Sequence, residues 1–170
     1  PKDIPQSVVD ASAAAEAAGE ILAPARNTLT KVPEKVTEIN VGGERPRIGV
    51  FVCRCGINIA GIIDVKALSE YARRLPHVAL VENNLFTCSA DTQDLIAARI
   101  REHNLNRIVI AACTPRTHEP LFQDTLKEAG LNGYLVEMAN IRNQNAWVHQ
   151  REPEMATAKA KDQVRMAVAK

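Results

Sequence analysis

The sequence predicts an α/β fold, a small doubly wound four-stranded parallel sheet in the order 2-1-3-4 with helices on both faces. Short and nearly continuous apolar runs, such as residues 47–52 and 107–112, are typical of strands covered on both sides. Segments with apolar residues at helical spacing separate these runs. Because this alternation produces right-handed crossovers, the strands are expected to be parallel. We also expect a helical arm and a linker ahead of the sheet.

The first part of the chain differs from the rest in composition. Residues 5–25 are rich in alanine, the residue with the highest helix propensity, and are expected to form a helix. From residue 24 to residue 46 the helical pattern is lost among polar residues and prolines, which is typical of a linker. We therefore place a helical tail and linker in residues 1–46 and the α/β domain in residues 47–170.

The elements of the α/β domain follow one another in a regular order. Strands are expected over residues 47–52, 78–82, 107–112 and 134–138. Helices are expected over residues 64–75, 91–103 and 118–129, and from about residue 145 to residue 169. Pro76 closes the first helix, Asp91 is placed to cap the second, and Gly130 follows the third at a position that favours a left-handed residue.

Composition and charge limit the classes of function. The 170 residues are 46% hydrophobic and 24% charged, which is ordinary for a globular protein with one core. A formal net charge of +1 favours neither a nucleic-acid partner nor an anionic membrane. No apolar run approaches the ~20 residues of a membrane span, and no secretory signal pattern is present, so we expect a cytoplasmic protein without direct membrane insertion. The chain begins at Pro1 rather than Met, and we expect it to be part of a longer protein.

Four cysteines carry the main functional signal. Cys53 and Cys55 follow the first expected strand, Cys88 follows the second, and Cys113 follows the third. In a reducing compartment, cysteines more often bind metals or act in catalysis than form disulfides. Ligands of open α/β sheets bind beyond the carboxyl ends of the strands, and the predicted order puts the switch point between strands one and three. The four thiols are therefore expected to face one crevice.

Three interpretations fit this set of thiols. The first is a metal centre, because four thiolates are the usual ligands of a [4Fe–4S] or [2Fe–2S] cluster and of structural zinc. Neither the CxxC knuckles of zinc sites nor the CxxCxxC run of ferredoxins is present, however. The second is a thiol–disulfide relay formed by Cys53 and Cys55. The third is structural, because free cysteine is among the residue types most often buried in cores.

The loop after the third strand adds polar groups to the same edge. Arg116 is placed to hold negative charge near a metal centre, and His118 is placed to donate a hydrogen bond or to help move a proton there. A structural role is also open, in which Thr117 caps the following helix and Glu119 and Pro120 favour its first turn. The two roles are compatible with each other.

Four stretches of the chain carry a further signal: VFVCRCG at residues 50–56, LFTCS at residues 85–89, AACTPRTHEP at residues 111–120 and ANIR at residues 139–142. Together they resemble the iron–sulfur flavoprotein subunit of heterodisulfide reductase and its bacterial relatives. The resemblance covers residues 47–170 and is to the amino-terminal domain of that subunit. It implies a [4Fe–4S] cluster in an electron-transfer complex, and the family's cysteine motifs fall on Cys53, Cys55, Cys88 and Cys113.

The resemblance also implies a larger protein around this domain. In the family the domain precedes an FAD domain and ferredoxin-type inserts, in a complex that can bifurcate electrons through the FAD. The expected partners are these flanking domains, other subunits of the same complex, and a hydrogenase or dehydrogenase that donates electrons. The chain is then part of an oxidoreductase subunit that is not active by itself. A cluster-free docking domain for partner subunits is the alternative function that we consider.

Two further segments bear on the resemblance. Family members commonly carry another cysteine in the segment that matches residues 144–147, where this chain has Asn145, and we expect Asn145, like Arg116 and His118, to lie beside the cluster. Residues 1–15 are similar to the closing helix of the family's FAD domain. This similarity implies that residues 4–7 contact FAD in the intact parent, although the chain alone is not expected to bind it; they are Ile4, Pro5, Gln6 and Ser7.

Overall fold

A computed structural model describes residues 2–28, 30 and 36–170 of the chain. The chain divides into two compact units, Pro1–Glu34 and Lys35–Lys170. The remaining positions, residues 1, 29 and 31–35, lie outside the described residues and include part of the predicted linker.

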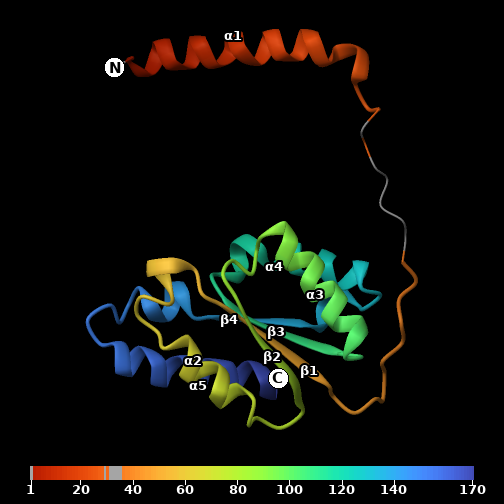
Figure 1. The fold of residues 1–170 in the computed structure, drawn as a ribbon, viewed down its shortest axis with the longest axis vertical. Helices are drawn as coiled ribbons and strands as arrows, with labels where there is room; N and C mark the ends of the chain where they lie inside the picture. The colour runs from red at the N-terminus through yellow and green to blue at the C-terminus, as the bar shows by residue number, and fades with distance from the viewer. Residues whose placement is uncertain (1, 29, 31–35) are drawn as a thin grey trace. The chain divides into compact units, whose positions relative to one another are not determined.

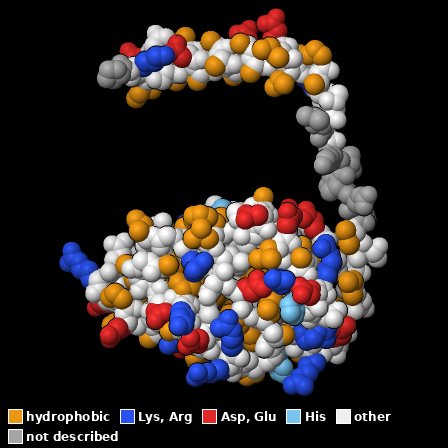
Figure 2. All heavy atoms as spheres, in the orientation of Figure 1, with side chains coloured by type: hydrophobic (Ala, Val, Ile, Leu, Met, Phe, Trp, Pro, Cys, Tyr) orange, Lys and Arg blue, Asp and Glu red, His pale blue; other side chains and the backbone are white. Residues whose placement is uncertain are grey.

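The described part of the first unit contains helix α1 (Ile4–Leu22) and a 3-10 turn (Ala23–Ala25). The Asp3 carboxylate accepts a hydrogen bond from the N–H of Gln6 at 2.8 Å and caps the helix start. Within the described part of this unit no α1 side chain is buried, and Ile4 is 82% exposed. Figure 2 shows apolar side chains along the surface of this helix. The described part of the unit therefore has a helix but no apolar core of its own.

The second unit is built on a four-stranded parallel sheet, as predicted. Its strands are β1 (Ile48–Cys53), β2 (Val78–Asn84), β3 (Arg107–Ala112) and β4 (Val136–Asn140). They lie in the order β2-β1-β3-β4, and every neighbouring pair is parallel. All six residues of β1 are buried, in agreement with the continuous apolar run that predicted a strand covered on both faces.

Helices cover both faces of this sheet (Figure 1). Helices α2 (Val65–Ala72) and α5 (Pro153–Ala169) lie on one face, and α3 (Ala90–Glu102) and α4 (Pro115–Glu128) lie on the other. The core between the layers includes the fully buried rings of Phe51 on β1 and Phe122 on α4. The predicted fold class is therefore confirmed.

Two helix starts differ from the sequence prediction. Helix α4 begins at Pro115 rather than His118, because the Thr114 hydroxyl caps it and Pro115 has no N–H that would need a partner there. Thr117 consequently lies inside the helix rather than at its cap. Asp91 likewise lies inside the first turn of α3, whose cap residue is Ser89.

The last predicted helix is interrupted. A π-helical turn, η4 (Arg142–Ala146), follows β4, and α5 begins only at Pro153. Proline lacks the N–H that a continuous helix needs and restricts the residue before it, so it favours a new helix start. The break leaves residues 147–152 as a loop at the end of the sheet.

Part of the segment assigned to the linker contacts the α/β unit. The N–H of Ile39 donates to the Gly130 carbonyl at 2.8 Å, and Val41 is buried in the core. The buried Asn106 side chain accepts the N–H of Arg47 at 2.7 Å and donates to the Arg45 carbonyl at 3.1 Å. The residues just before β1 are therefore held against the start of the sheet.

The surface of the α/β unit has mixed charge. Basic and acidic side chains are interspersed over the face that Figure 2 shows. Some of them form ion pairs, such as Arg99 with Glu82 at 2.6 Å. Among the helices of the described residues, none has the length and apolar character that crossing a bilayer requires.

Gly49 is a position in β1 where a side chain has no room. A Cβ there would meet Cδ1 of the buried Leu105 at 2.6 Å and Cε2 of the buried Phe51 at 3.2 Å. Gly49→Ala is therefore expected to lower the free energy of unfolding by about 1–3 kcal/mol. Urea unfolding followed by the fluorescence of Trp147 measures this change.

Gly19→Ala is the matched control, because nothing lies within 4 Å of a Cβ at that position of α1. It is expected to leave the unfolding midpoint of the α/β unit unchanged. Equal midpoints for Gly49→Ala and the unsubstituted protein would contradict the close approach at β1.

Candidate metal centre at the thiol edge

The carboxyl ends of the four strands lie level with one another. Cys53, the last residue of β1, pairs with Asn84, the last residue of β2, and Ala112 at the end of β3 pairs with Asn140 at the end of β4. The loops that follow these strands therefore start at one edge of the sheet. We call this edge, with the loops that carry Cys53, Cys55, Cys88 and Cys113, the thiol edge.

Cys53 is the best-fixed thiol of this edge. It is only 5% exposed, and its Sγ accepts the backbone N–H of Thr87 at 3.5 Å. The next residue, Arg54, donates its N–H to the Asn84 carbonyl at 2.8 Å. These two contacts bind the end of β1 to the last residue of β2 and to the loop that follows it.

The other three thiols sit in different surroundings. Cys55 is half-buried and precedes a 3-10 turn in which Gly56 has a φ of 39°, a left-handed value that favours glycine. Cys88 is exposed in the loop between β2 and α3. Cys113 is buried between the end of β3 and the start of α4. All four thiols are free, so none is committed to a disulfide.

The thiols act on one another electrostatically. Although Cys88 is exposed, its thiol is partly covered by the protein; this partial desolvation raises its pKa, and the neighbouring Cys53 and Cys55 raise it further. Burial also raises the pKa of Cys113, with Cys88 and Cys53 adding to the effect. The edge therefore disfavours several thiolates at once unless a cation lies among them. A bound metal ion supplies such a cation, because coordination deprotonates a thiol outright.

Arg142, the last residue of the ANIR motif, is a cation that acts on this edge. Its charge lowers the pKa of both Cys88 and Cys113, against the effect of burial. Its guanidinium carbon lies 4.9 Å from the ring centroid of Trp147. The Trp147 Nε1–H in turn donates to Asn58 Oδ1 at 3.1 Å. Arg142 comes two residues after the end of β4, and this place after a strand was a signal that it belongs to the edge.

The three polar residues expected beside the centre lie in different places. Arg116 and His118 lie in the first turn of α4, where the Arg116 N–H donates to the Thr114 hydroxyl at 3.4 Å. Asn145 is fully buried in η4, where its Nδ2 donates to the Ala156 carbonyl and to Gln163 Oε1, each at 2.9 Å. Asn145 therefore fastens η4 to α5 through its amide nitrogen. That these residues serve a bound group stays a prediction.

Two buried polar atoms at the thiol edge have no hydrogen-bond partner within the part of the chain that the structure describes. They are Asn84 Oδ1, at the end of β2, and Thr87 Oγ1, on the loop beside Cys88. Such an atom costs about 1–3 kcal/mol when it is left unpaired. Asn145 Oδ1 is a third atom of this kind. A group bound at the thiol edge is one source of the missing partners.

The cysteines are therefore the type of ligand that a metal centre needs, but they are not arranged as a preformed metal site. Across residues 2–28, 30 and 36–170, no three or more His, Cys, Asp or Glu side chains are arranged so as to hold a metal ion. Four thiols from three loops nevertheless share one edge with a cation and unpaired polar atoms. The residues expected to contact FAD, Ile4 to Ser7, form the exposed first turn of α1 in the other unit.

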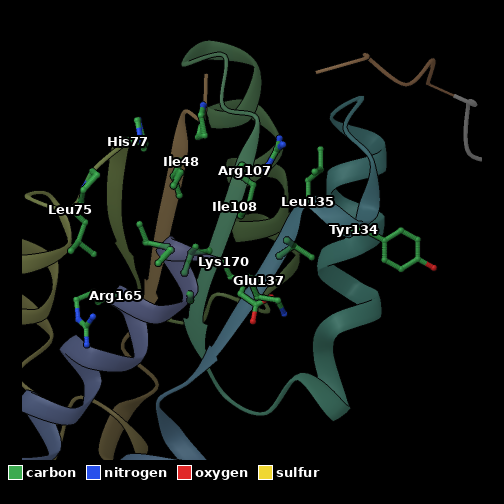
Figure 3. Close-up of a pocket in the computed structure, with 17 residues that line it drawn as sticks. Ile48, Leu75, His77, Arg107, Ile108, Tyr134, Leu135, Glu137, Arg165 and Lys170 are labelled. Carbon is green, nitrogen blue, oxygen red and sulfur yellow. The ribbon is translucent and has the colours of Figure 1, made fainter. Parts of the chain in front are cut away.

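A cavity of about 650 Å³ lies at the opposite end of the strands (Figure 3). It is lined by the first residues of β1, β3 and β4 and by the last turn of α5. Figure 3 shows Ile48 and Ile108 on the strands, Arg165 on α5, and Lys170 directly after the end of α5. Lys170 pairs with Glu137 there at 2.7 Å. The lining contains no cysteine, so this cavity is separate from the thiol edge.

Comparison with known proteins identifies close relatives of part of the chain. No protein-family model matches it. Over 127 residues, 75% of the chain, it is 54% identical to an iron-sulfur subunit of CoB–CoM heterodisulfide reductase from Methanopyrus kandleri. The identity is also 54% over 127 residues with the corresponding subunit of the H(2):CoB-CoM heterodisulfide,ferredoxin reductase of Methanothermobacter thermautotrophicus. With a heterodisulfide reductase subunit-like protein of Archaeoglobus profundus it is 51% over the same length.

These relatives are much longer than the chain. The matched stretch makes up 19% of the first two and 18% of the third, so the chain spans about a fifth of their length. The resemblance predicted from the cysteine motifs is confirmed over three quarters of the chain.

Replacement of Arg142 tests the electrostatics of the edge. Arg142→Gln removes the positive charge that stabilises the thiolates of Cys88 and Cys113, so their pKa values rise further. At a fixed pH below these values the thiolate fraction falls, and alkylation of both cysteines by iodoacetamide is expected to slow by up to about tenfold. Mass spectrometry of the metal-free protein measures the rate at each cysteine.

Arg116→Gln is the matched comparison, because Arg116 is the cation that the sequence predicts at this edge. Arg116→Gln is expected to change the alkylation rates of Cys88 and Cys113 less than Arg142→Gln does. A larger effect at Arg116 would contradict the assignment of the cation to Arg142.

Proposed function

We propose, from the homology of three quarters of the chain to the iron–sulfur subunit of heterodisulfide reductase, that the chain is an electron-transfer module of such a complex and holds a [4Fe–4S] cluster. One of the relatives is named as an iron-sulfur protein, and another as part of a ferredoxin reductase. The cluster would be bound by the thiol edge through Cys53, Cys55, Cys88 and Cys113.

One observation carries this proposal: loops from three adjacent parallel strands bring four free cysteines to the same edge. Such an edge is where open α/β sheets bind their ligands. Four thiolates are also the usual ligand set of an iron–sulfur cluster. The raised pKa values of Cys88 and Cys113 are compatible with this function, because a bound metal ion would supply positive charge that favours the ionised form of both thiols.

The chain's own residues have separate tasks in this proposal. A cluster, when bound, accepts and releases one electron at a time. The N–H of Thr87 donates to Cys53 Sγ and stabilises negative charge there. Arg142 offsets part of the charge of the thiolates, and Trp147 holds the guanidinium in place. The buried strands around Cys53 and Cys113 exclude water from two of the four sulfurs.

The whole protein is proposed to be larger than the chain. Its α/β unit would follow the closing helix of an FAD domain, represented by α1 and the residues up to 46, with Ile4 to Ser7 facing the FAD. Further FAD and ferredoxin-type domains, other subunits of the complex, and an electron-donating enzyme would be its partners. The chain itself would carry electrons without carrying out the terminal reaction.

Analysis of iron and sulfide after anaerobic purification tests the cluster. We expect about four iron and four sulfide per chain, with a brown colour. Cys113→Ala should lose both, since Cys113 is one of only four cysteines in the chain and no further thiol can replace it. Ser69→Ala is the control, because Ser69 is a buried polar residue of α2 whose hydroxyl bonds to Val65 and Asn83 rather than to a cysteine.

Two results would contradict the cluster, and each favours another function. A colourless, iron-free protein that still binds its partner subunits after all four cysteines are changed to serine would favour a docking domain. Rapid and reversible oxidation of Cys53 and Cys55 to a disulfide, without bound iron, would favour a thiol relay.

A further inference from the structure

A buried chain of hydrogen bonds runs from α4 through α3 to the thiol edge. The Thr125 hydroxyl of α4 contacts Gln93 Oε1. The Gln93 Nε2 donates to the Thr87 carbonyl at 2.5 Å. The N–H of the same Thr87 donates to Cys53 Sγ at 3.5 Å. Thr87, Gln93 and Thr125 are 0%, 8% and 3% exposed, so the whole chain lies inside the protein.

We propose that Gln93 is a positioning residue of the thiol edge, which holds the loop before Cys88 so that the Thr87 N–H stays on the Cys53 sulfur.

The residue type at position 93 supports this role. Helix α3 packs on α4, and the neighbouring buried positions of α3 include Ile96 and Ile100. An apolar side chain would serve helix packing there without the cost of desolvating an amide. Both ends of the Gln93 amide are instead used, one toward α4 and one toward the loop. A residue that only joined the two helices would need the contact to Thr125 alone.

The geometry of the loop explains what Gln93 contributes. Residues 85–89 connect β2 to α3, and Leu85, Phe86 and Cys88 are exposed, so these three side chains provide little packing. The Ser89 hydroxyl closes the end of the loop on the Phe86 carbonyl at 2.8 Å. Within the described residues, the Gln93 amide is the buried side chain that donates to the middle of this loop. Loss of that bond frees the residue whose N–H reaches Cys53.

The consequence for the cluster rests on the proposed function. Hydrogen bonds to ligand sulfurs stabilise the reduced, more negative state of an iron–sulfur cluster and raise its reduction potential. Gln93, whose amide bonds to Thr87 and Thr125 and not to a cysteine, would therefore influence the potential through Thr87. It acts on the cluster only by keeping one N–H in place.

Amide hydrogen exchange in the full-length, metal-free chain tests the positioning role directly. Gln93→Met keeps the length of the side chain and removes both hydrogen bonds. We expect exchange of the Thr87 amide to become up to about tenfold faster, as for the loss of one net hydrogen bond. The Ile110 amide in the central strand β3 is the internal reference and should not change. Thr125→Val removes only the hydrogen bond between α4 and Gln93, so it should accelerate exchange of the Thr87 amide less than Gln93→Met does.

Ser69→Ala is the matched control for general loosening. The Ser69 hydroxyl is also buried and also joins a helix to β2, through Asn83 Oδ1 at 2.7 Å, but its hydrogen bonds do not involve residues 85–89. It should leave exchange at Thr87 unchanged. Unchanged exchange of Thr87 in Gln93→Met, or equal acceleration in Ser69→Ala, would overturn the proposal.

The reduction potential of the anaerobically reconstituted protein is the second readout. Gln93→Met should shift it to a more negative value, and Ser69→Ala should not, because only the former loosens the donor to Cys53. An unshifted potential in Gln93→Met would overturn the effect on the cluster. If neither the variants nor the unsubstituted protein bind iron, the proposed function fails while the exchange experiment still decides the role of Gln93.

Discussion

The parallel pairing of β1 with both β2 and β3 is the constraint on which the thiol edge depends. Parallel strands run in one direction, so their carboxyl ends and the loops that follow them lie on the same side of the sheet. The register is level enough that Cys53 pairs with Asn84 at the last residue of each strand. Residues that are far apart in sequence, such as Cys55 and Cys113, thereby come to one edge without a contiguous motif.

This origin explains why the cysteine spacing resembles neither a zinc knuckle nor a ferredoxin run. In those sites a short loop supplies several ligands, and the spacing along the chain reflects the geometry of the metal. Here the backbone ladder of the sheet brings the loops together, and the spacing reflects the length of the intervening helices α2 and α3. A domain of this type therefore needs an intact core before its thiols can act together.

Opposing effects act on the thiols of this edge. Burial and mutual repulsion raise the pKa of Cys88 and Cys113, whereas the charge of Arg142 lowers both pKa values, and the Thr87 N–H donates to the sulfur of Cys53. Arg142 and Thr87 in turn depend on other residues: Trp147 contacts the guanidinium of Arg142, and Gln93 donates to the carbonyl of Thr87. The residues that adjust such a centre are then distributed over other elements of the fold, while the cysteines stay at the strand ends and loops.

The sequence by itself determined the fold class, the strand order and the edge on which the cysteines lie, whereas only the tertiary structure decided which polar residues act on the thiols. Apolar runs, helical spacing and right-handed crossovers are local patterns that leave few topologies open, and the motifs around Cys53, Cys88 and Cys113 were enough to recognise the heterodisulfide reductase relatives. The break before α5 was missed because the alanine-rich helical pattern outweighed the single signal of Pro153. The sequence favoured Arg116, which is close to Cys113 along the chain, but the charge that lowers the pKa of Cys113 comes from Arg142 after β4. Gln93 gave no signal at all, because glutamine is mostly a solvent-exposed residue. Long-range contacts of this kind depend on how the layers pack, and one sequence carries no local pattern that reports them.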